Sequence, residues 1–322
     1  MMTLLRDMPT GGPDDWLVAR IRARRALLLD NWDELLVART PLESLPHAPW
    51  RSGFSAMDPL GGRRALQQEY AWVFRRMAEP LRRLLLPLFW LAELRTLAIC
   101  LRQRIGGQAL DVDLLRASLL CDRVKRAVVE PADGTSAIGA LAKVLSPHDA
   151  AFGRLPEAFR GGGCAALEGA LYDISLERFA ATFTHPVMAR YLGLLIDGRN
   201  LVGLAKHLHW RLTAPPPFLR GGRFAPPTLE RLFSRGDAGG IVALVARLGG
   251  RSQAGLPGDV EHGVLEAQRR ELRRLGREPE GTGPILDYLW RCGQECRNIG
   301  LLARLVPAGG ADAGDVGDEI VR

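Results

Sequence analysis

The sequence has few aromatic residues and no long uninterrupted apolar run. Only 7% of its 322 residues are aromatic, while 47% are hydrophobic and 25% are charged. This composition is typical of a globular protein and argues against disorder. The most hydrophobic stretch, residues 84–101, is interrupted by Pro87, Glu93 and Arg95, so its apolar part is too short to cross a bilayer. We expect it to form a buried helix, and we expect no signal peptide at residues 1–13.

Motifs for catalysis and metal binding are also missing. The run Gly161–Gly163 is not followed by the Lys and Ser or Thr of a phosphate-binding loop, so it is interpreted as a flexible connection. No nucleophile-elbow or zinc-helix motif occurs. His207 and His209 would diverge by about 200° on a helix, and Cys292 with Cys296 lacks a second pair of ligands. We therefore expect no catalytic residue, no metal site and no cofactor.

Cysteine and charge bear on the compartment and on possible partners. The five cysteines have no paired spacing, which favours packed thiols in a reducing compartment. Lys and Arg number 43 against 36 Asp and Glu, a formal charge of +7, and such an excess favours acidic partners. Residues 14–29 are rich in arginine, so a basic helical module that binds nucleic acid is an alternative hypothesis. No known nucleic-acid motif supports it, and aromatic residues are not interleaved with the basic ones. The hypothesis that the chain is an enzyme ranks third among the possible functions.

Helical periodicity covers most of the chain, and no convincing alternation of apolar and polar residues predicts strands. We therefore predict an all-α fold. The helix over residues 63–104 is expected to bend or divide near Pro80 and Pro87, and Ser146 is expected to cap the start of another helix. The remaining expected helices include residues 14–29, 165–183, 186–212, 259–275 and 284–305.

A short pattern recurs three times, about a hundred residues apart. Each copy has an acid, an arginine two places on, Thr or Asn three places on, Leu or Ile four places on, and a base nine places on. The acids with their polar partners are Glu93 and Thr96, Asp197 and Asn200, and Glu295 and Asn298. The basic pairs are Arg95 and Arg102, Arg199 and Lys206, and Arg297 and Arg304. On a helix the two bases share one face, so each copy offers a basic ridge beside an apolar stripe.

A fixed period is typical of a duplicated structural unit. We predict three helical domains, at residues 1–107, 108–214 and 215–307, followed by a flexible tail at 308–322. The proline-rich residues 215–227 are the clearest boundary. Because the same acid recurs at three equivalent places, it favours a structural role over catalysis, which usually needs groups with different pKa values.

Four segments together resemble a known family. They are Trp16-x-x-Ala19-Arg20-Ile21-Arg22-Ala23, Leu167-Glu168 through Tyr172-Asp173 with Arg178-Phe179, Asp197-x-x-Asn200-Leu201, and Tyr288-Leu289-Trp290 leading to Glu295-Cys296-Arg297-Asn298-Ile299. In these segments the chain resembles the C subunit of the V-type and A-type rotary ATPases, the homologue of the eukaryotic d subunit. Thr96, where that family usually has Asn, makes it a divergent member.

This resemblance implies a fold and a role. It implies a funnel of three similar helical domains around a pseudo-threefold axis. It also implies a non-catalytic subunit, peripheral on the cytoplasmic face of the membrane and monomeric within its complex, that joins the central-stalk axle subunits to the membrane rotor ring and passes torque for ion transport. On this basis we expect the six basic residues of the three copies to line or support the cavity that receives the axle. We expect the acids and their Asn or Thr partners to fix helix positions by buried hydrogen bonds.

Overall fold

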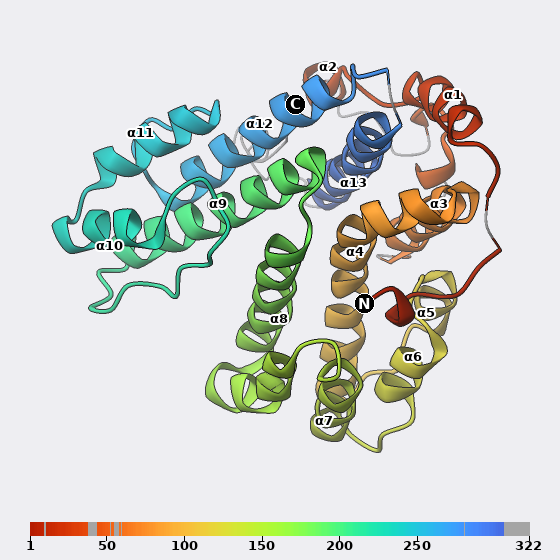
Figure 1. Ribbon diagram of the computed structural model, residues 1–322, viewed down its shortest axis with the longest axis horizontal. Helices are drawn as coiled ribbons and strands as arrows, with labels where there is room; N and C mark the ends of the chain where they lie inside the picture. Colours follow the sequence, from red (N-terminus) through yellow and green to blue (C-terminus); the bar gives the residue numbers. More distant parts are fainter. Residues whose placement is uncertain are drawn as a thin grey trace. The chain divides into compact units, whose positions relative to one another are not determined.

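The computed structural model describes residues 1–9, 11–37, 44–51, 53–54, 58, 60–279 and 281–305 (Figure 1), with the backbone alone at 33, 36–37 and 304–305. The regular elements that these residues form are helices, and Leu5 pairs with Leu120 in an isolated antiparallel bridge. The prediction of an all-α fold is confirmed. The predicted tail at 308–322 lies outside the described residues.

The chain forms two compact units. The first contains Met1–Ser175 and the described residues from Tyr288 onward, and the second contains Leu176–Asp287. Both borders fall inside helices, one in α8 (Leu155–Thr182) and one in α13 (Thr282–Leu305). The division into three domains around a pseudo-threefold axis stays a prediction.

The first unit is built around α4 (Glu79–Ile105), whose side chains Leu85, Phe89, Trp90 and Leu97 are fully buried. Its other helices are α1 (Asp14–Arg25), α2 (Trp32–Val37), α3 (Gly61–Arg76), α5 (Val112–Ala117), α6 (Asp122–Val129) and α7 (Gly134–Leu145), with short 3-10 helices at Met2–Leu4, Pro49–Arg51 and Ala150–Arg154. By length and composition α4 could cross a membrane, but 72% of its most apolar window is buried inside the protein. It is therefore packed like the core helix of a globular unit.

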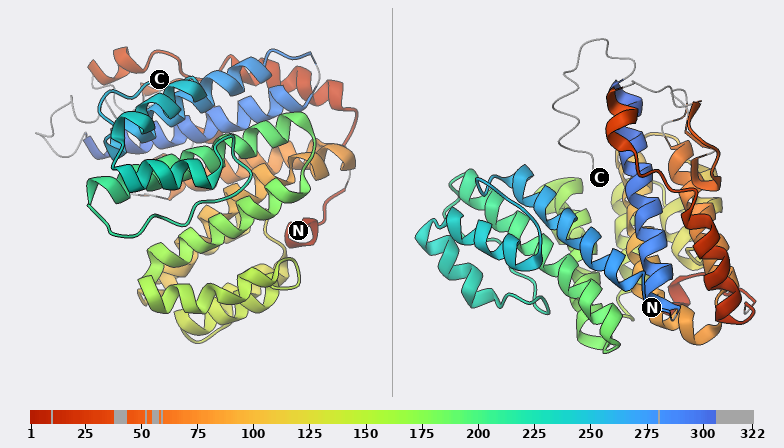
Figure 2. Two further views of the ribbon diagram at one scale, coloured as in Figure 1. Left: turned by 60° about the vertical axis from the view of Figure 1, so that its left-hand side comes forward. Right: turned by 90° about the horizontal axis from the view of Figure 1, so that it is seen from above.

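The second unit places α9 (Pro186–His209) beside α12 (Pro257–Leu275), with α10 (Pro226–Arg235) and α11 (Ala238–Leu248) packed on them (Figure 2). Its core joins Leu201 and Leu204 of α9 to Val245 of α11 and Val264 of α12. The two long helices come very close at Gly198, where a Cβ would lie 2.5 Å from Val264 Cγ1. Glycine is needed there because any side chain would push the helices apart.

Three local predictions need correction, and each has a physical reason. The helix expected over residues 63–104 divides before Pro80, but Pro87 lies inside α4 and does not break it. Ser146 follows the end of α7 and donates its hydroxyl to the Ala142 carbonyl oxygen at 2.7 Å, so it does not start a helix. Proline after a helix end is common because it cannot continue the helix.

The third correction concerns the glycine run at residues 161–163. The predicted flexible connection is instead a kink inside α8, where Gly162 and Gly163 leave helical geometry. Gly163 has φ of 64°, a left-handed conformation that glycine adopts without the steric cost of a side chain. The chain is helical on both sides of the kink, so two helical segments of different direction meet at Gly162 and Gly163.

Candidate functional site

The first acid of the repeated pattern, Glu93 on α4, is completely buried. Its Oε1 accepts a hydrogen bond from the Leu119 backbone N–H at 2.7 Å, and its Oε2 accepts one from the Ser118 hydroxyl at 2.8 Å. Burial raises the pKa of Glu93, and the two hydrogen bonds oppose that rise. The carboxyl group thereby ties α4 to the segment that joins α5 to α6.

Thr96, one turn further along α4, lies in the same buried network. The Gln67 side chain on α3 lies between Glu93 and Thr96. Its amide nitrogen lies 3.0 Å from Glu93 Oε1, and its amide oxygen lies 3.1 Å from Arg63 Nη2 and also faces the Thr96 hydroxyl. Burial lowers the pKa of Arg63, and the nearby charge of Glu93 opposes this shift. The network connects α3 to α4 through neutral and charged groups, although Arg63 Nε is buried without a hydrogen-bond partner among the described residues.

The second copy repeats this arrangement on α9 in the second unit. The Asp197 carboxylate is buried and accepts hydrogen bonds from the backbone N–H groups of Arg223 at 3.0 Å and Phe224 at 3.2 Å. Burial raises the pKa of Asp197, while these hydrogen bonds lower it. The Asn200 amide donates to the Leu219 carbonyl oxygen and accepts from the Leu219 N–H, both at 2.9 Å. Together they hold the loop before α10 against α9.

The third copy lies on α13, and its acid holds a segment from the start of the chain. Glu295 is buried and accepts from the Leu29 N–H at 2.9 Å, the Trp50 indole N–H at 2.6 Å and the Arg51 Nε at 2.5 Å. Asn298 is also buried. Unlike the other two acids, Glu295 accepts a hydrogen bond from a charged guanidinium in addition to the backbone and indole N–H groups.

All three acids therefore receive backbone N–H groups from a loop. For Glu93 and Asp197 the main partner lies 26 residues further along the chain in both cases. For Glu295 the partners Trp50 and Arg51 lie 245 and 244 residues earlier. The sequence identified the acids, but it carried no signal for their partners.

The basic positions of the pattern are less uniform. Arg95 and Arg199 are exposed, Lys206 and Arg297 are half-buried, and the side chain of Arg304 lies outside the described residues. Arg102 is exposed but paired, because its Nη2 donates to Glu168 Oε2 of α8 at 2.6 Å. Arg95, Arg102 and Arg297 belong to the first unit, and Arg199 and Lys206 belong to the second.

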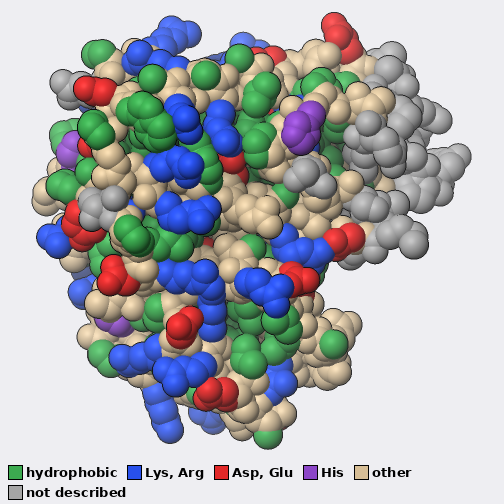
Figure 3. Space-filling model, turned by 90° about the vertical axis from the view of Figure 1, so that its right-hand side faces the viewer, with side chains coloured by type: hydrophobic (Ala, Val, Ile, Leu, Met, Phe, Trp, Pro, Cys, Tyr) green, Lys and Arg blue, Asp and Glu red, His purple; other side chains and the backbone are tan. Residues whose placement is uncertain are grey.

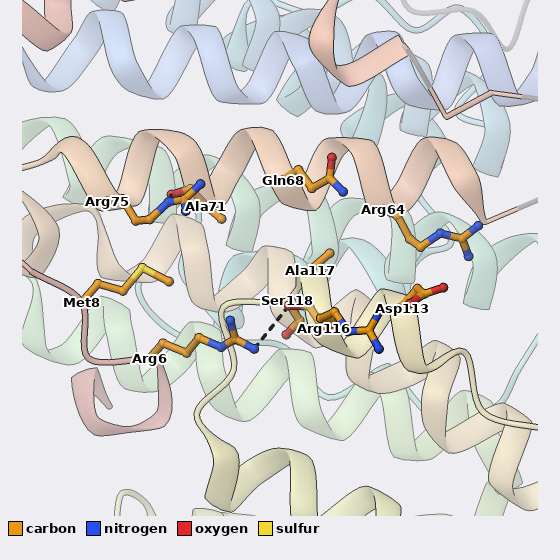
Figure 4. A pocket seen from close by; sticks show the side chains of 10 residues that line it. All are labelled: Arg6, Met8, Arg64, Gln68, Ala71, Arg75, Asp113, Arg116, Ala117 and Ser118. Carbon is orange, nitrogen blue, oxygen red and sulfur yellow. Dashed lines mark hydrogen bonds and ion pairs between the residues drawn. The ribbon is translucent and has the colours of Figure 1, made fainter.

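The first unit also contains a basic groove of about 480 Å³ between α3 and α5 (Figure 4). Arginines from three segments line it: Arg6, Arg64, Arg75 and Arg116. Asp58 and Asp111 neutralise Arg64, and Asp113 pairs with Arg116 at 2.6 Å. No sequence signal indicates this groove, because its arginines are far apart in the chain and follow no motif.

The candidate metal ligands of the sequence do not gather into a site in the part of the chain that the structure describes. No group of three or more His, Cys, Asp or Glu residues there could hold a metal ion. Burial raises the pKa of the Cys292 and Cys296 thiols, which keeps both protonated and unreactive. His207 places Nδ1 3.0 Å from the Ala214 carbonyl oxygen.

Comparison with known proteins gives one match. A family model described as "ATP synthase (C/AC39) subunit" matches residues 62–312, which is more than half of the chain and includes all three copies of the acid pattern. No curated protein matches the chain.

Proposed function

This chain belongs to the ATP synthase (C/AC39) subunit family, and we propose from that membership that it joins the rotor axle of a V/A-type ATPase to the membrane rotor ring. In this role it performs no chemistry and transmits torque between the two. It would sit as a peripheral protein on the cytoplasmic face of the membrane, in contact with the membrane only through the ring.

The observation that supports this role best is the recurring buried acid. A part that transmits torque must resist bending, and packed helices provide stiffness. Glu93, Asp197 and Glu295 each add a buried hydrogen-bonded link between a long helix and a loop. These acids are buried and already accept two or more hydrogen bonds, so they suit a mechanical role better than a chemical one.

The proposed contact with the axle uses the basic positions of the pattern: Arg95, Arg102, Arg199, Lys206, Arg297 and Arg304. Among them Arg95 and Arg199 are exposed, and exposed guanidinium groups bind carboxylates through paired hydrogen bonds. The second Arg of the first copy, Arg102, is engaged with Glu168 inside the protein. Arg95 and Arg199 are exposed positions from two different copies of the pattern, so they are the first positions to change.

ATP-driven ion transport in membrane vesicles tests this proposal. Vesicles from cells that lack the chain should lose transport, and the unaltered gene should restore it. Arg95→Glu combined with Arg199→Glu should restore transport poorly, because the new charges repel an acidic partner. Arg231→Glu combined with Arg235→Glu provides the control, since both residues are exposed on α10 outside the pattern. Normal transport in vesicles without the chain would contradict the proposal.

A further inference from the structure

A surface of α1 and α3 in the first unit combines arginines with tryptophans and belongs to no copy of the repeated pattern. We call it the α1–α3 surface, and it consists of Trp16, Arg20, Arg24, Trp72, Arg75 and Arg76. The Arg20 guanidinium carbon lies 4.0 Å from the centre of the Trp16 ring. Those of Arg24 and Arg76 lie 3.8 Å and 4.5 Å from the centre of the Trp72 ring. Such stacking holds guanidinium groups in place and attracts them to the rings.

Positive charge on this surface is only partly neutralised. Its one paired arginine is Arg24, whose Nη1 lies 2.6 Å from the buried Glu69 Oε2. Arg20, Arg75 and Arg76 form no ion pair with any carboxylate in the described ranges. Burial lowers the pKa of Arg76, and so do the charges of Arg20, Arg75 and Arg24, while the charge of Glu69 raises it.

The positive surface continues into the groove between α3 and α5. Arg75 belongs to both, and Arg6 lines the groove without a carboxylate partner among the residues that the structure describes. Lys125 lies beside it, and burial together with the charge of Arg6 lowers its pKa to about 8. Figure 3 shows Lys and Arg side chains spread over this side of the first unit, with Asp and Glu side chains among them. A ligand would meet the arginines that form no ion pair with a carboxylate in the described residues, namely Arg6, Arg20, Arg75 and Arg76.

The aromatic residues help to decide which kind of ligand fits. Proteins that bind single-stranded nucleic acid offer successive open rings for bases to stack on, but two guanidiniums already cover Trp72. The large apolar side chain that this surface presents to solvent is Trp16, which is 46% exposed. One tryptophan is too little apolar surface for insertion into a membrane. Positioned guanidiniums beside an exposed tryptophan are instead typical of protein interfaces, where Arg and Trp are enriched at the strongest contacts.

We propose that the α1–α3 surface binds a carboxylate-rich segment of a partner polypeptide. Carboxylates match the planar fork of arginine, and the stacked guanidiniums lose little freedom on binding. The chemistry of the surface carries this inference, which rests on the proposed function only for the expectation that the partner belongs to the ATPase.

The test uses the full chain and a fluorescein-labelled peptide of ten glutamates, with binding followed by fluorescence anisotropy at low salt. Changing Arg20, Arg75 and Arg76 to Gln should weaken binding about tenfold, which corresponds to about 1.4 kcal/mol. Arg24 is left in place because it pairs with Glu69. The matched control changes Arg231, Arg235 and Arg251 to Gln, which removes the same charge from exposed positions of the second unit and should weaken binding less than twofold.

A second variant tests the stacking without altering the charge. Trp72→Leu should weaken binding about threefold, because Arg24 and Arg76 lose the ring that holds them. Equal weakening by the two arginine triples would overturn the proposal, since it would show attraction to net charge alone. Stronger binding of phosphatidylserine vesicles or of single-stranded DNA through the same three arginines would overturn it as well.

The peptide experiment is independent of the proposed function. Specific peptide binding without any effect of the chain on ion transport would uphold the surface and contradict the coupling role. Lost transport without specific peptide binding would support the coupling role and contradict the proposal for the α1–α3 surface.

Discussion

Asn200→Leu isolates one link between a long helix and its loop. The Asn200 side chain is buried on α9 and forms two hydrogen bonds with a single residue, donating to the Leu219 carbonyl oxygen and accepting from the Leu219 N–H at 2.9 Å each. Leucine has a similar size but can form neither bond. The variant therefore leaves one backbone donor and one backbone acceptor of a buried residue without a partner.

The expected loss follows from those two groups. An unsatisfied buried donor or acceptor costs about 1–3 kcal/mol, and the added apolar side chain recovers part of this by its burial. We expect the free energy of unfolding to fall by about 2–4 kcal/mol, which is a large part of the stability of an ordinary domain.

Urea unfolding, followed by circular dichroism, measures this change. The matched control is His209→Leu, a polar-to-leucine change at an exposed position in the last turn of the same helix, which should shift stability by no more than about 0.5 kcal/mol. If Asn200→Leu unfolds at the same urea concentration as the control, the two hydrogen bonds do not hold the loop and the argument from the repeated pattern is refuted.

Three further predictions concern the other links and the kink in α8. Burial raises the pKa of Glu93 above its ordinary value of 4.5, so ionisation of Glu93 lowers the free energy of unfolding as the pH rises from 4.5. The Glu93→Gln variant cannot ionise there, so its stability relative to the unaltered protein should increase with pH. A difference in urea titrations that does not change with pH would contradict this. Glu295→Ala leaves the buried Arg51 without its carboxylate and should cost about 3–5 kcal/mol, with an unchanged thermal midpoint as the contrary result. Gly163→Ala should cost about 1 kcal/mol or more because of its φ of 64°, whereas a more stable variant in thermal melting would show that the kink is not required.

Sequence patterns predicted what depends on local spacing. Helical periodicity gave the all-α fold, and the matched offsets identified Glu93, Asp197 and Glu295 as equivalent positions. The partners of these acids could not be predicted in the same way. Whether Leu119 or Leu29 reaches a given carboxylate depends on the path of a loop, and loops of irregular structure carry no periodic signal.

Two residues illustrate how tertiary structure overrides local signals. Pro87 predicts a break, yet it lies among the buried side chains of α4, where packing on all sides outweighs the hydrogen bond that proline removes. Ser146-Pro147 fits the start of a helix as well as the end of one, because serine caps helix starts and proline also follows helix ends. Only the position of α7 decides between these interpretations.

The α1–α3 surface could be predicted only in part. The arginines of residues 14–29 are dense enough to indicate a basic helix face, but Trp72 and Arg76 come from a helix about fifty residues further on. Arg24 stacks on Trp72 because α1 packs near α3, whereas Arg76 stacks on Trp72 within α3 itself. The contact between Arg24 and Trp72 could not be predicted from the sequence, because the two residues are far apart in it.

The most direct test of the coupling role is affinity purification of the tagged protein from its own membranes in mild detergent, with mass spectrometry of the proteins recovered. We expect rotor-ring and central-stalk subunits of a V/A-type ATPase in near-equal amounts with the tagged chain. Recovery of the chain alone, while intact ATPase is present in the same extract, would contradict the account.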